Sequence, residues 1–435
     1  MLPPRRYLAA AILLSLLVSF YLIYTTDTGR KILHKPLSHQ PKPSLPTCLP
    51  SEAPLESGWE FKVERDGDDY GLTDEQCQAA FPKLFLEIEK SVEARRGNPI
   101  SYKEYNSREL EKGMVRGIIF EGELHIVDFE DMSNTFSRAK ATLNSLHRAL
   151  TSSPQRHTLP NIEFMFTTED YAIGSEPVWV YSKQDGDDWA WLMPDFAYWS
   201  WPEVKVGSYQ AIRRRIAHID DGGIIHGNAV PGIKFQDKDK RLVWRGNVDT
   251  APEIRGALIE ATKGKSWASV HALHWADKED IEKNLIPMED HCKYMFLAHT
   301  EGRSFSGRGK YLQNCRSVLV AHKLIWREAH HGAMVSSGPD TNFVEVERDF
   351  SNLESKINHL LDHPEIAEQI AENSVKTFRD RYLTPAAEAC YWRRLIRAYA
   401  SVCDFEPTFY TDSHGAKSRG VPYESFLLTG SVKPD

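Results

Sequence analysis

The stretch "YMFLAHTEGRSFSGRGKYLQNCRSVLVAH", residues 294–322, decides the fold. It begins with an apolar run at 294–300 and continues through a loop rich in Gly, Ser and Arg. A helix-like segment at 308–315 then precedes a second apolar run at 317–322. Short apolar runs bounded by turn residues are typical of buried strands. A strand, a helix and a second strand in this order predict two parallel strands joined by a right-handed crossover.

The alternation continues on both sides of this unit. After residue 235 the pattern predicts strands at 241–246, 268–275 and 342–347, and helices at 252–264, 350–362, 364–381 and 384–402. Before residue 235 it predicts a capped helix from Thr73 to about Arg96, a hairpin at 115–129, a helix at 137–151, and strands at 162–168 and 178–183. We therefore expect an α/β fold with two Rossmann-like domains facing a cleft, with ligands bound at the carboxyl ends of strands.

Residues 7–24 form an uncharged apolar segment that follows Arg5 and Arg6. At about 1.5 Å per residue the segment is about 27 Å long, enough to cross a bilayer. Because it is longer than the apolar core of a typical signal peptide, we expect an uncleaved anchor, and a cleaved signal peptide is the alternative. Residues 25–58 carry six prolines and predict an extended stem. The anchor, the stem and the large body after them predict a type II membrane protein. Its short span suits the thin membranes of the endoplasmic reticulum or Golgi.

Composition excludes two classes of protein. Aromatic residues make up 11% of the 435 residues, which is too many for a disordered chain. The net charge of −8 argues against nucleic-acid binding through bulk charge. The six cysteines form no Cys-x-x-Cys motif, which argues against zinc, and in an oxidising compartment they predict disulfides with 15 possible pairings.

The glycine-rich loop has the features of a phosphate site. Glycine allows close backbone approach, N–H groups at a helix start attract anions, and Arg308 and Lys310 add positive charge. The alternative is a surface turn softened by glycine. Arg245 and Gly246 also follow a strand, and Arg303 lies in the loop. Converging guanidiniums would stabilise the charge on a leaving diphosphate, although each Arg alone is compatible with a surface salt bridge.

Asp170 follows the apolar strand predicted at 162–168 in the first half of the chain. A carboxylate across the cleft from the phosphates is suited to act as a general base on an acceptor hydroxyl. A helix cap or turn is the alternative role, and Glu169 is a competitor for the position.

The stretch "MPDFAYWSWPE", 193–203, brings Trp199, Trp201 and Glu203 close together. Aromatic faces and carboxylates suit sugars, while core packing is the alternative use of the aromatic rings. The "DGDD" runs at 66–69 and 185–188 are typical of Gly–Asp turns, and neither directly ends a strand, so we expect no metal there.

The histidines of the second half are interpreted as structural or surface residues, because the sequence shows no cysteine or acidic frame around them. They are His271, His274, His330 and His331.

Three blocks resemble a known family. They are "MEDHCKYMFLAHTEGRSFSGRGKYLQNCRSVLVAHKL" at 288–324, "NFVEVERDFSNL" at 342–353 and "ACYWRRLIRAY" at 389–399. They resemble the capsule-associated-protein type glycosyltransferases, glycosyltransferase family 90, which include the protein O-glucosyltransferases. The resemblance covers about residues 100–405 and looks closest to the fungal branch.

The resemblance implies a fold of the GT-B type, a UDP-sugar donor, inverting transfer, and no required metal or cofactor. The family's catalytic aspartate falls on Asp170 in "FMFTTEDY", and its Trp-rich donor-side segment falls on Trp199. The residues implied at the donor and its phosphates are Arg245, Gly246, Arg303, Ser306, Arg308, Lys310, Asp349 and Ser351. The resemblance also implies the disulfides Cys292–Cys315 and Cys77–Cys390, leaving Cys48 and Cys403 over.

The expected domain organisation follows from both lines of argument. It is a signal anchor at 1–24, a stem at 25–58, an acceptor domain at 59–235, a nucleotide-sugar domain at 236–385, and a C-terminal helix and tail at 386–435 that packs back on the body.

Two departures from the family pattern concern the donor and the acceptor. "RGK" at 308–310 replaces the frequent Arg-Phe-Lys, so Gly309 is expected to make the loop more flexible. "WSWPE" replaces the Trp-x-Gly-Gly-Pro of the protein glucosyltransferases, which leaves the sugar and the acceptor open. Xylose or glucose is expected as the sugar, and a polysaccharide, glycolipid or glycoprotein as the acceptor.

Two rival functions remain. One is a catalytically silent, glycan-binding relative, which would have little use for Asp170 together with Arg245 and Arg308. The other is a metal-dependent transferase that uses an Asp-x-Asp run.

Overall fold

The computed structural model describes residues 58–130, 136–170, 177–204, 206–415 and 417–432. The chain divides into two units, Met1–Pro54 and Leu55–Asp435, and the second is described here. The predicted anchor at 7–24 and nearly all of the stem lie outside the described residues. Within the described ranges, no helix is both long and apolar enough to cross a membrane.

The first sheet has six strands in the order β15-β2-β1-β3-β4-β6. Its strands are β1 (Met114–Phe120), β2 (Glu123–Phe129), β3 (Ile162–Thr167), β4 (Val178–Val180), β6 (Trp191–Leu192) and β15 (Val421–Pro422). The predicted hairpin is confirmed as β1–β2, and Glu121 and Gly122 at its turn both have positive φ. Only β3, β4 and β6 pair in parallel. The expectation of a Rossmann-like parallel sheet is therefore wrong for the other half of this sheet, because a tight turn leaves no room for a crossover helix.

The second sheet has five strands in the order β10-β9-β11-β12-β14, and all of its pairs are parallel. Its strands are β9 (Asp239–Gly246), β10 (Ala268–Ala272), β11 (Tyr294–His299), β12 (Val318–His322) and β14 (Val344–Val346). The helices between them are α9 (Pro252–Thr262), α10 (Lys278–Asn284) and α11 (Gly309–Leu312). The predicted alternation of strands and helices is confirmed here, and the buried central strands explain the continuous apolar runs.

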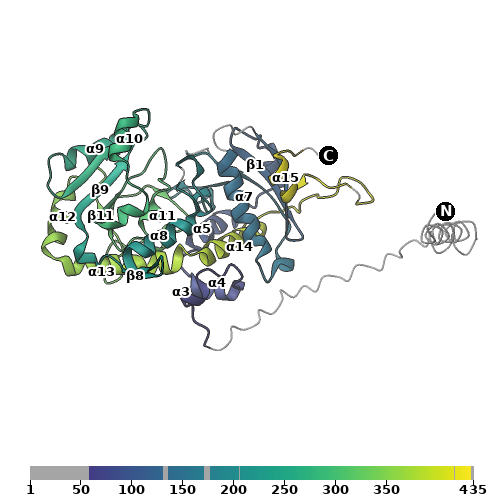
Figure 1. Cartoon of the computed structure of the whole chain (residues 1–435). Coiled ribbons are helices and arrows are strands. Elements are labelled where there is room, and N and C mark those ends of the chain that lie inside the picture. The colour runs from purple at the N-terminus through teal and green to yellow at the C-terminus, as the bar shows by residue number, and fades with distance from the viewer. Residues whose placement is uncertain (1–57, 131–135, 171–176, 205, 416, 433–435) are drawn as a thin grey trace, which may run out of the picture. The chain divides into compact units, whose positions relative to one another are not determined.

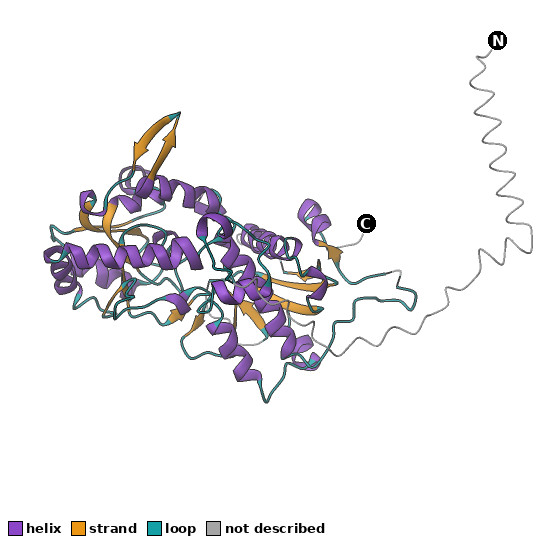
Figure 2. Ribbon diagram, turned by 90° about the horizontal axis from the view of Figure 1, so that it is seen from below, coloured by secondary structure: helices purple, strands orange, loops and turns teal. Residues whose placement is uncertain are grey.

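Helices pack against the strands of the body, and one hairpin stands apart from it (Figures 1 and 2). The helices before β9 are α3 (Val63–Asp66), α4 (Asp74–Ala80), α5 (Leu86–Arg95), α6 (Tyr102–Ser107), α7 (Phe136–Thr151) and α8 (Tyr209–Asp221). The exposed hairpin consists of β7 (Gly222–Ile225) and β8 (Asn228–Pro231), and a short pair links β5 (Lys183–Gln184) to β13 (Trp326–Arg327). The 3-10 turns include η2 (Phe196–Tyr198), η3 (Pro202–Val204), η5 (Glu289–Lys293) and η6 (His331–Ala333).

The capping box at Thr73 is confirmed, because its side chain accepts from the Gln76 N–H and the Gln76 side chain accepts from the Thr73 N–H. The single helix predicted up to Arg96 is instead two helices, α4 and α5. The break between them contains Pro82, which has no N–H to donate and disfavours helical backbone before it.

The C-terminal segment returns to the first sheet. Helices α12 (Leu353–Asp362) and α13 (Pro364–Ser374) cover the second sheet, and α13 continues as π-helix over Val375–Tyr382. Helix α14 (Pro385–Ser401) then packs against α4, α5 and α7, and α15 (Tyr423–Thr429) follows β15.

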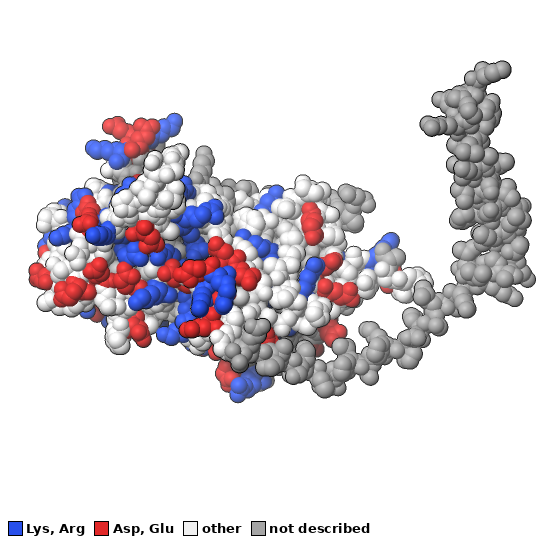
Figure 3. Space-filling model, turned by 60° about the horizontal axis from the view of Figure 1, so that its bottom comes forward, with Lys and Arg blue, Asp and Glu red and all other residues white. Residues whose placement is uncertain are grey.

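Both disulfides implied by the resemblance are present. Cys77 and Cys390 join α4 to α14, and Cys292 and Cys315 bracket the glycine-rich loop. Cys403 is free, and burial raises the pKa of its thiol to about 12. Acidic and basic side chains are interspersed on the face shown in Figure 3.

Candidate active site

A cavity of about 880 Å³ opens between the strand ends of the second sheet and the loops that follow the first sheet. Eight of the predicted site residues line it, namely Asp170, Trp201, Glu203, Arg245, Gly246, Arg303, Ser306 and Arg308. The others, Trp199, Lys310, Asp349 and Ser351, are absent from its wall. The two segments that the sequence placed at strand ends, around 170 and 300–308, therefore meet at one cavity, and Ser304 donates a hydrogen bond to the Asp170 carbonyl.

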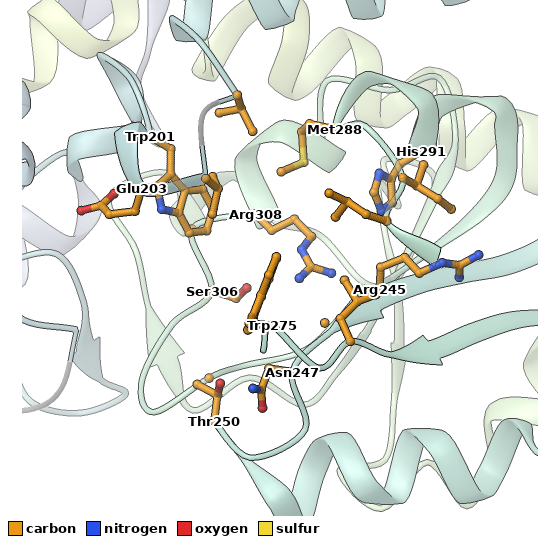
Figure 4. A pocket seen from close by; sticks show the side chains of 18 of the residues that line it. Trp201, Glu203, Arg245, Asn247, Thr250, Trp275, Met288, His291, Ser306 and Arg308 are labelled. Atoms are coloured by element: carbon orange, nitrogen blue, oxygen red, sulfur yellow. The ribbon is translucent and has the colours of Figure 1, made fainter. Parts of the chain in front are cut away.

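Arg308 is the central cation of the cavity. It precedes α11, and its guanidinium lies in the middle of the view in Figure 4. Among the described residues it forms no side-chain hydrogen bond or ion pair, and it lies 5.8 Å from the centroid of the Trp244 ring. A Cβ on Gly246 would lie 2.8 Å from Trp244 Cζ2 and 3.1 Å from Arg308 Nη2, so glycine leaves room for both side chains. Burial, together with repulsion from Arg255, lowers the Arg308 pKa to about 9. A bound anion would relieve both effects.

Arg255 is a second buried cation, which the sequence analysis missed. It projects from α9 into the cavity wall and donates to the carbonyls of Glu301 and Asn247, at 3.1 and 2.6 Å. No carboxylate pairs with it within the described residues, and burial lowers its pKa to about 10. The only feature of the sequence that could have indicated Arg255 is its position, one turn into the helix that follows the strand containing Arg245.

Arg245 lines the cavity but turns its guanidinium away from Arg308 (Figure 4). It donates to the carbonyls of Asn284, Trp244 and Ser269 and to the Ser269 hydroxyl. These bonds use most of its donors, because a guanidinium has five N–H groups. In this conformation Arg245 holds strand ends together, and its guanidinium is not aimed at the part of the cavity occupied by Arg308.

Lys310 is buried beneath the loop. Its ammonium has no exposed surface, pairs with Asp195 at 2.6 Å and donates to the Gly307 carbonyl at 3.1 Å. Because these partners occupy it on the core side, it does not reach the cavity. Gly309 is also constrained, since a Cβ there would lie 2.8 Å from His299 Cε1. This close packing, rather than loop flexibility, accounts for glycine at position 309.

Asp170 and Glu169 take different positions. Asp170 lies on the cavity wall with its side chain 39% exposed, and its Oδ2 lies 3.9 Å from Arg138 Nη1. Glu169 packs beside Gly113, and burial, followed by the charge of Asp170, raises its pKa. Of the two neighbouring carboxylates, Asp170 is therefore the one available to a ligand in the cavity.

Arg138 of α7 was missed by the sequence analysis. Its Nε donates to Glu203 at 3.0 Å, and its guanidinium lies 4.6 Å from the Phe196 ring centroid. Arg138 therefore connects Glu203 to Asp170 along one wall of the cavity. Because Arg138 lies within a helical pattern, the sequence gives no indication that it contacts Glu203 and Asp170.

Trp201 and Trp199 also take different positions. Trp201 faces the cavity and lies 3.6 Å from the position of a Cβ on Gly307. Trp199 instead stacks with the guanidinium of Arg148, 4.7 Å from its ring centroid. Trp199 and Trp201 therefore point in different directions, although they are only two residues apart. The resemblance alone did not show which of the two faces the cavity.

Asp349 and Ser351 lie at the start of α12, away from the cavity wall. Asp349 Oδ1 accepts from the Ser351 N–H at 3.0 Å, and hydrogen bonding from the Ser351 side chain, followed by that backbone N–H, lowers the Asp349 pKa. The intervening Phe350 has φ of 59°, so the Asp-x-Ser pattern builds a tight turn here.

The side of the cavity beyond Arg308 is apolar. Trp275, whose side chain is 54% exposed, stands at the cavity together with the side chains of Leu273, Leu285 and Ile286. His291 lies beside them, and burial, with the charge of Arg308, lowers its pKa to about 4.

The two "DGDD" runs form salt bridges outside the cavity. Asp66 pairs with Arg65 at 2.6 Å, and Asp185 accepts from Arg327 at 2.9 and 3.1 Å.

The expectation that no acidic group surrounds the histidines is wrong. Asp280 Oδ2 lies 3.1 Å from His274 Nδ1, and Glu328 Oε2 lies 3.2 Å from His331 Nε2.

Comparison with known proteins agrees with this geometry. The family model described as Glycosyl transferase family 90 matches residues 75–421. Protein O-glucosyltransferase 1 of Homo sapiens is 23% identical over 279 residues, covering 58% of this chain and 65% of that protein. The O-glucosyltransferase rumi homolog of Aedes aegypti is 27% identical over 275 residues, covering 58% and 64%. O-glucosyltransferase rumi of Drosophila melanogaster is 24% identical over 271 residues, covering 57% and 62%.

The matched part of the chain thus spans slightly less than two thirds of each of these relatives. The family match is broader, because it extends over both sheets and the whole cavity. The chain therefore belongs to glycosyl transferase family 90 and is distantly related to the protein O-glucosyltransferases.

Proposed function

We propose that this protein is an inverting, metal-independent glycosyltransferase that moves a sugar from a UDP-sugar to a hydroxyl group of a glycan or glycoconjugate. One observation carries the proposal. Two guanidiniums, the partly buried Arg308 and the buried Arg255, have no carboxylate partner among the described residues and share a cavity with Asp170.

A diphosphate suits the two arginines. Each guanidinium is desolvated and repels the other, so the free site carries an electrostatic cost that an anion would offset. Ser306 and the loop backbone before α11 add polar groups beside Arg308 (Figure 4). These charges act on the leaving group, because negative charge builds on the diphosphate as its bond to the sugar breaks.

Asp170 is assigned as the general base. Its carboxylate takes the proton of the acceptor hydroxyl, and the oxygen attacks the anomeric carbon. The bond from that carbon to the β-phosphate oxygen breaks on the opposite face, and its electron pair leaves with UDP. Arg138 lies 3.9 Å from Asp170 and would hold the base in place.

The remaining walls suggest how the substrates are arranged. We assign the nucleobase to the apolar side, where Trp275 offers a ring face and Leu273 and Leu285 offer apolar contacts. The sugar and acceptor then lie toward Trp201 and Glu203, between the phosphates and Asp170. Xylose or glucose is proposed as the transferred sugar, and a polysaccharide, glycolipid or glycoprotein as the acceptor.

We also propose a GT-B type architecture with an acceptor domain at 59–235, a nucleotide-sugar domain at 236–385, and a C-terminal segment at 386–435. The two disulfides favour the secretory pathway, since such bonds persist in oxidising compartments. Membrane attachment through residues 7–24, with the catalytic body in the lumen of the endoplasmic reticulum or Golgi, is part of the same proposal.

Thermal unfolding of the full chain with UDP in EDTA tests the nucleotide site. UDP at a hundred times its dissociation constant adds about 2.7 kcal/mol, which raises the midpoint. A shift only when Mn²⁺ is supplied would instead favour the Asp-x-Asp alternative. No shift under either condition would favour the silent glycan-binding relative.

The variant Asp170→Asn tests the base. It should retain the UDP-induced shift and lose turnover with UDP-glucose or UDP-xylose, because only the proton acceptor is removed. Glu169→Gln is the matched control and should remain active. Normal turnover by Asp170→Asn would refute the assignment.

A further inference from the structure

A buried cluster of ionisable side chains lies outside the cavity. Glu328 and His330 follow β13, His331 begins η6, and the exposed fractions of the three residues are 2%, 1% and 6%. One ligand atom of each lies within 4.8 Å of the others. None of the three lines the cavity, so the proposed transfer reaction leaves the cluster without a role.

The hydrogen bonds leave lone pairs unused. His330 Nε2 lies 2.7 Å from Gln313 Oε1, and in this orientation of the Gln313 amide the nitrogen is the donor, because a carbonyl oxygen only accepts. His330 Nδ1 therefore has a free lone pair, and it is buried without a partner. Both carboxylate oxygens of Glu328 and Nδ1 of His331 are likewise buried without a hydrogen bond of good geometry. Such orphaned atoms point to a missing ligand.

The charges indicate the sign of that ligand. Glu328 brings a carboxylate into the core, and an unpaired buried charge is costly. Lys310, the nearby ammonium, is taken by Asp195 and the Gly307 carbonyl. The only basic group within ion-pair distance of Glu328 in the described chain is His331, at 3.2 Å. A bound cation would therefore balance this carboxylate.

The donor set specifies the kind of cation. Two imidazole nitrogens and one carboxylate oxygen suit zinc, which binds these ligands at about 2.0–2.2 Å. Tetrahedral geometry at that distance places ligands about 3.4 Å apart, so the ligand atoms, which lie within 4.8 Å of one another, would have to approach by up to about 1.4 Å. Metal-bound histidines donate their other N–H to a carbonyl or carboxylate, as His330 does to Gln313.

We propose that Glu328, His330 and His331 bind one divalent transition-metal ion, zinc by their chemistry. The role is structural. Gln313 is the residue that follows α11, and Arg308 is the residue that precedes it. The ion would thus fix the segment 328–331 to the helix that carries the phosphate-binding loop, without contacting the substrates.

Metal analysis of the full chain, purified without chelators, tests the site. We expect about one zinc per chain, and a loss of most of it in Glu328→Gln and in His331→Gln. His274→Gln is the matched control, because His274 forms an equally close but exposed pair with Asp280 and should leave the zinc content unchanged. Zinc that persists in both cluster variants would overturn the assignment.

A second measurement does not depend on the yield of zinc. The chain is stripped by dialysis against a chelator and titrated with Co²⁺, whose visible bands are strong in tetrahedral sites. We expect saturation at one equivalent, no such bands in Glu328→Gln, and a higher melting temperature once metal is restored. Absence of both zinc and a cobalt spectrum in the folded wild-type chain would overturn the proposal. Neither measurement involves UDP, so their outcome is independent of the proposed reaction.

Discussion

Two cations only two residues apart in the sequence, Arg308 and Lys310, face different surroundings. The Lys310 ammonium meets a carboxylate and a carbonyl on the core side, while the Arg308 guanidinium meets no acceptor in the described part of the chain and lies close to Gly246. Residue type alone predicted a phosphate role for both. The positions of their partners separate a ligand-binding cation from a structural one.

Arg308→Ala should weaken UDP binding tenfold to a hundredfold. Hydrogen bonds to charged groups contribute about 1.5–3 kcal/mol each, and this residue has no competing partner in the described protein. Isothermal titration with UDP in EDTA measures the change. Arg303→Ala is the control, since Arg303 lies on the same loop but is exposed, and it should have a smaller effect. Unchanged affinity in Arg308→Ala would remove the phosphate-loop interpretation.

UDP-glucose affinity should be constant between pH 5.5 and 8. Because burial and Arg308 lower the His291 pKa to about 4, the imidazole stays neutral in this range. An ordinary histidine would gain a proton as the pH falls through about 6.5 and would then strengthen anion binding. Titrations across the range check the prediction, with His291→Gln as the control. A several-fold gain in affinity at low pH that His291→Gln abolishes would contradict it.

At the scale of elements, the strand-to-helix unit at 294–322 determines the geometry of the cavity. Strand β11 ends at His299, the loop crosses toward Asp170, and α11 begins beside Arg308. On its core side, the loop is held to the turn η2 by the ion pair between Lys310 and Asp195. The aspartate also caps that turn by accepting from the Ala197 N–H at 2.7 Å.

Lys310→Met should destabilise the protein by about 3–5 kcal/mol, because it leaves the buried carboxylate of Asp195 unpaired. Urea unfolding measures the loss. The double variant Lys310→Met/Asp195→Asn should recover much of it, since both charges are then removed. A direct phosphate ligand would give the opposite pattern, in which UDP binding weakens at nearly unchanged stability.

The sequence predicted those elements whose pattern is local. Every strand of the second sheet was predicted, because a parallel sheet buried on both faces produces continuous apolar runs. The hairpin and the capping box also have short signatures. By contrast, β15 has only two residues, and the bounds of α8 were not predicted. Arg138 and Arg255 were missed because their importance depends on what packs opposite them.

At the scale of the whole molecule, the chain closes on itself. Helix α14 crosses back from the second sheet to pack on α4, α5 and α7, and its Arg393 donates to the carbonyls of Tyr70 and Leu72. The disulfide Cys77–Cys390 fastens this return across 313 residues, whereas Cys292–Cys315 spans only 23. The two bonds therefore constrain the unfolded chain to very different extents.

Removal of each disulfide should show this difference. Loop-closure entropy gives about 6 kcal/mol for the long bridge and about 3 kcal/mol for the short one. Urea unfolding of the double variant Cys77→Ala/Cys390→Ala should therefore show the larger loss of unfolding free energy. Cys403→Ala is the control, because it leaves both disulfides intact. The short disulfide brackets the phosphate loop. The double variant Cys292→Ala/Cys315→Ala should therefore lose UDP affinity as well, which titration would show. If the short bridge costs more stability than the long one, local packing around the loop, rather than closure of the whole chain, dominates the stability of the body.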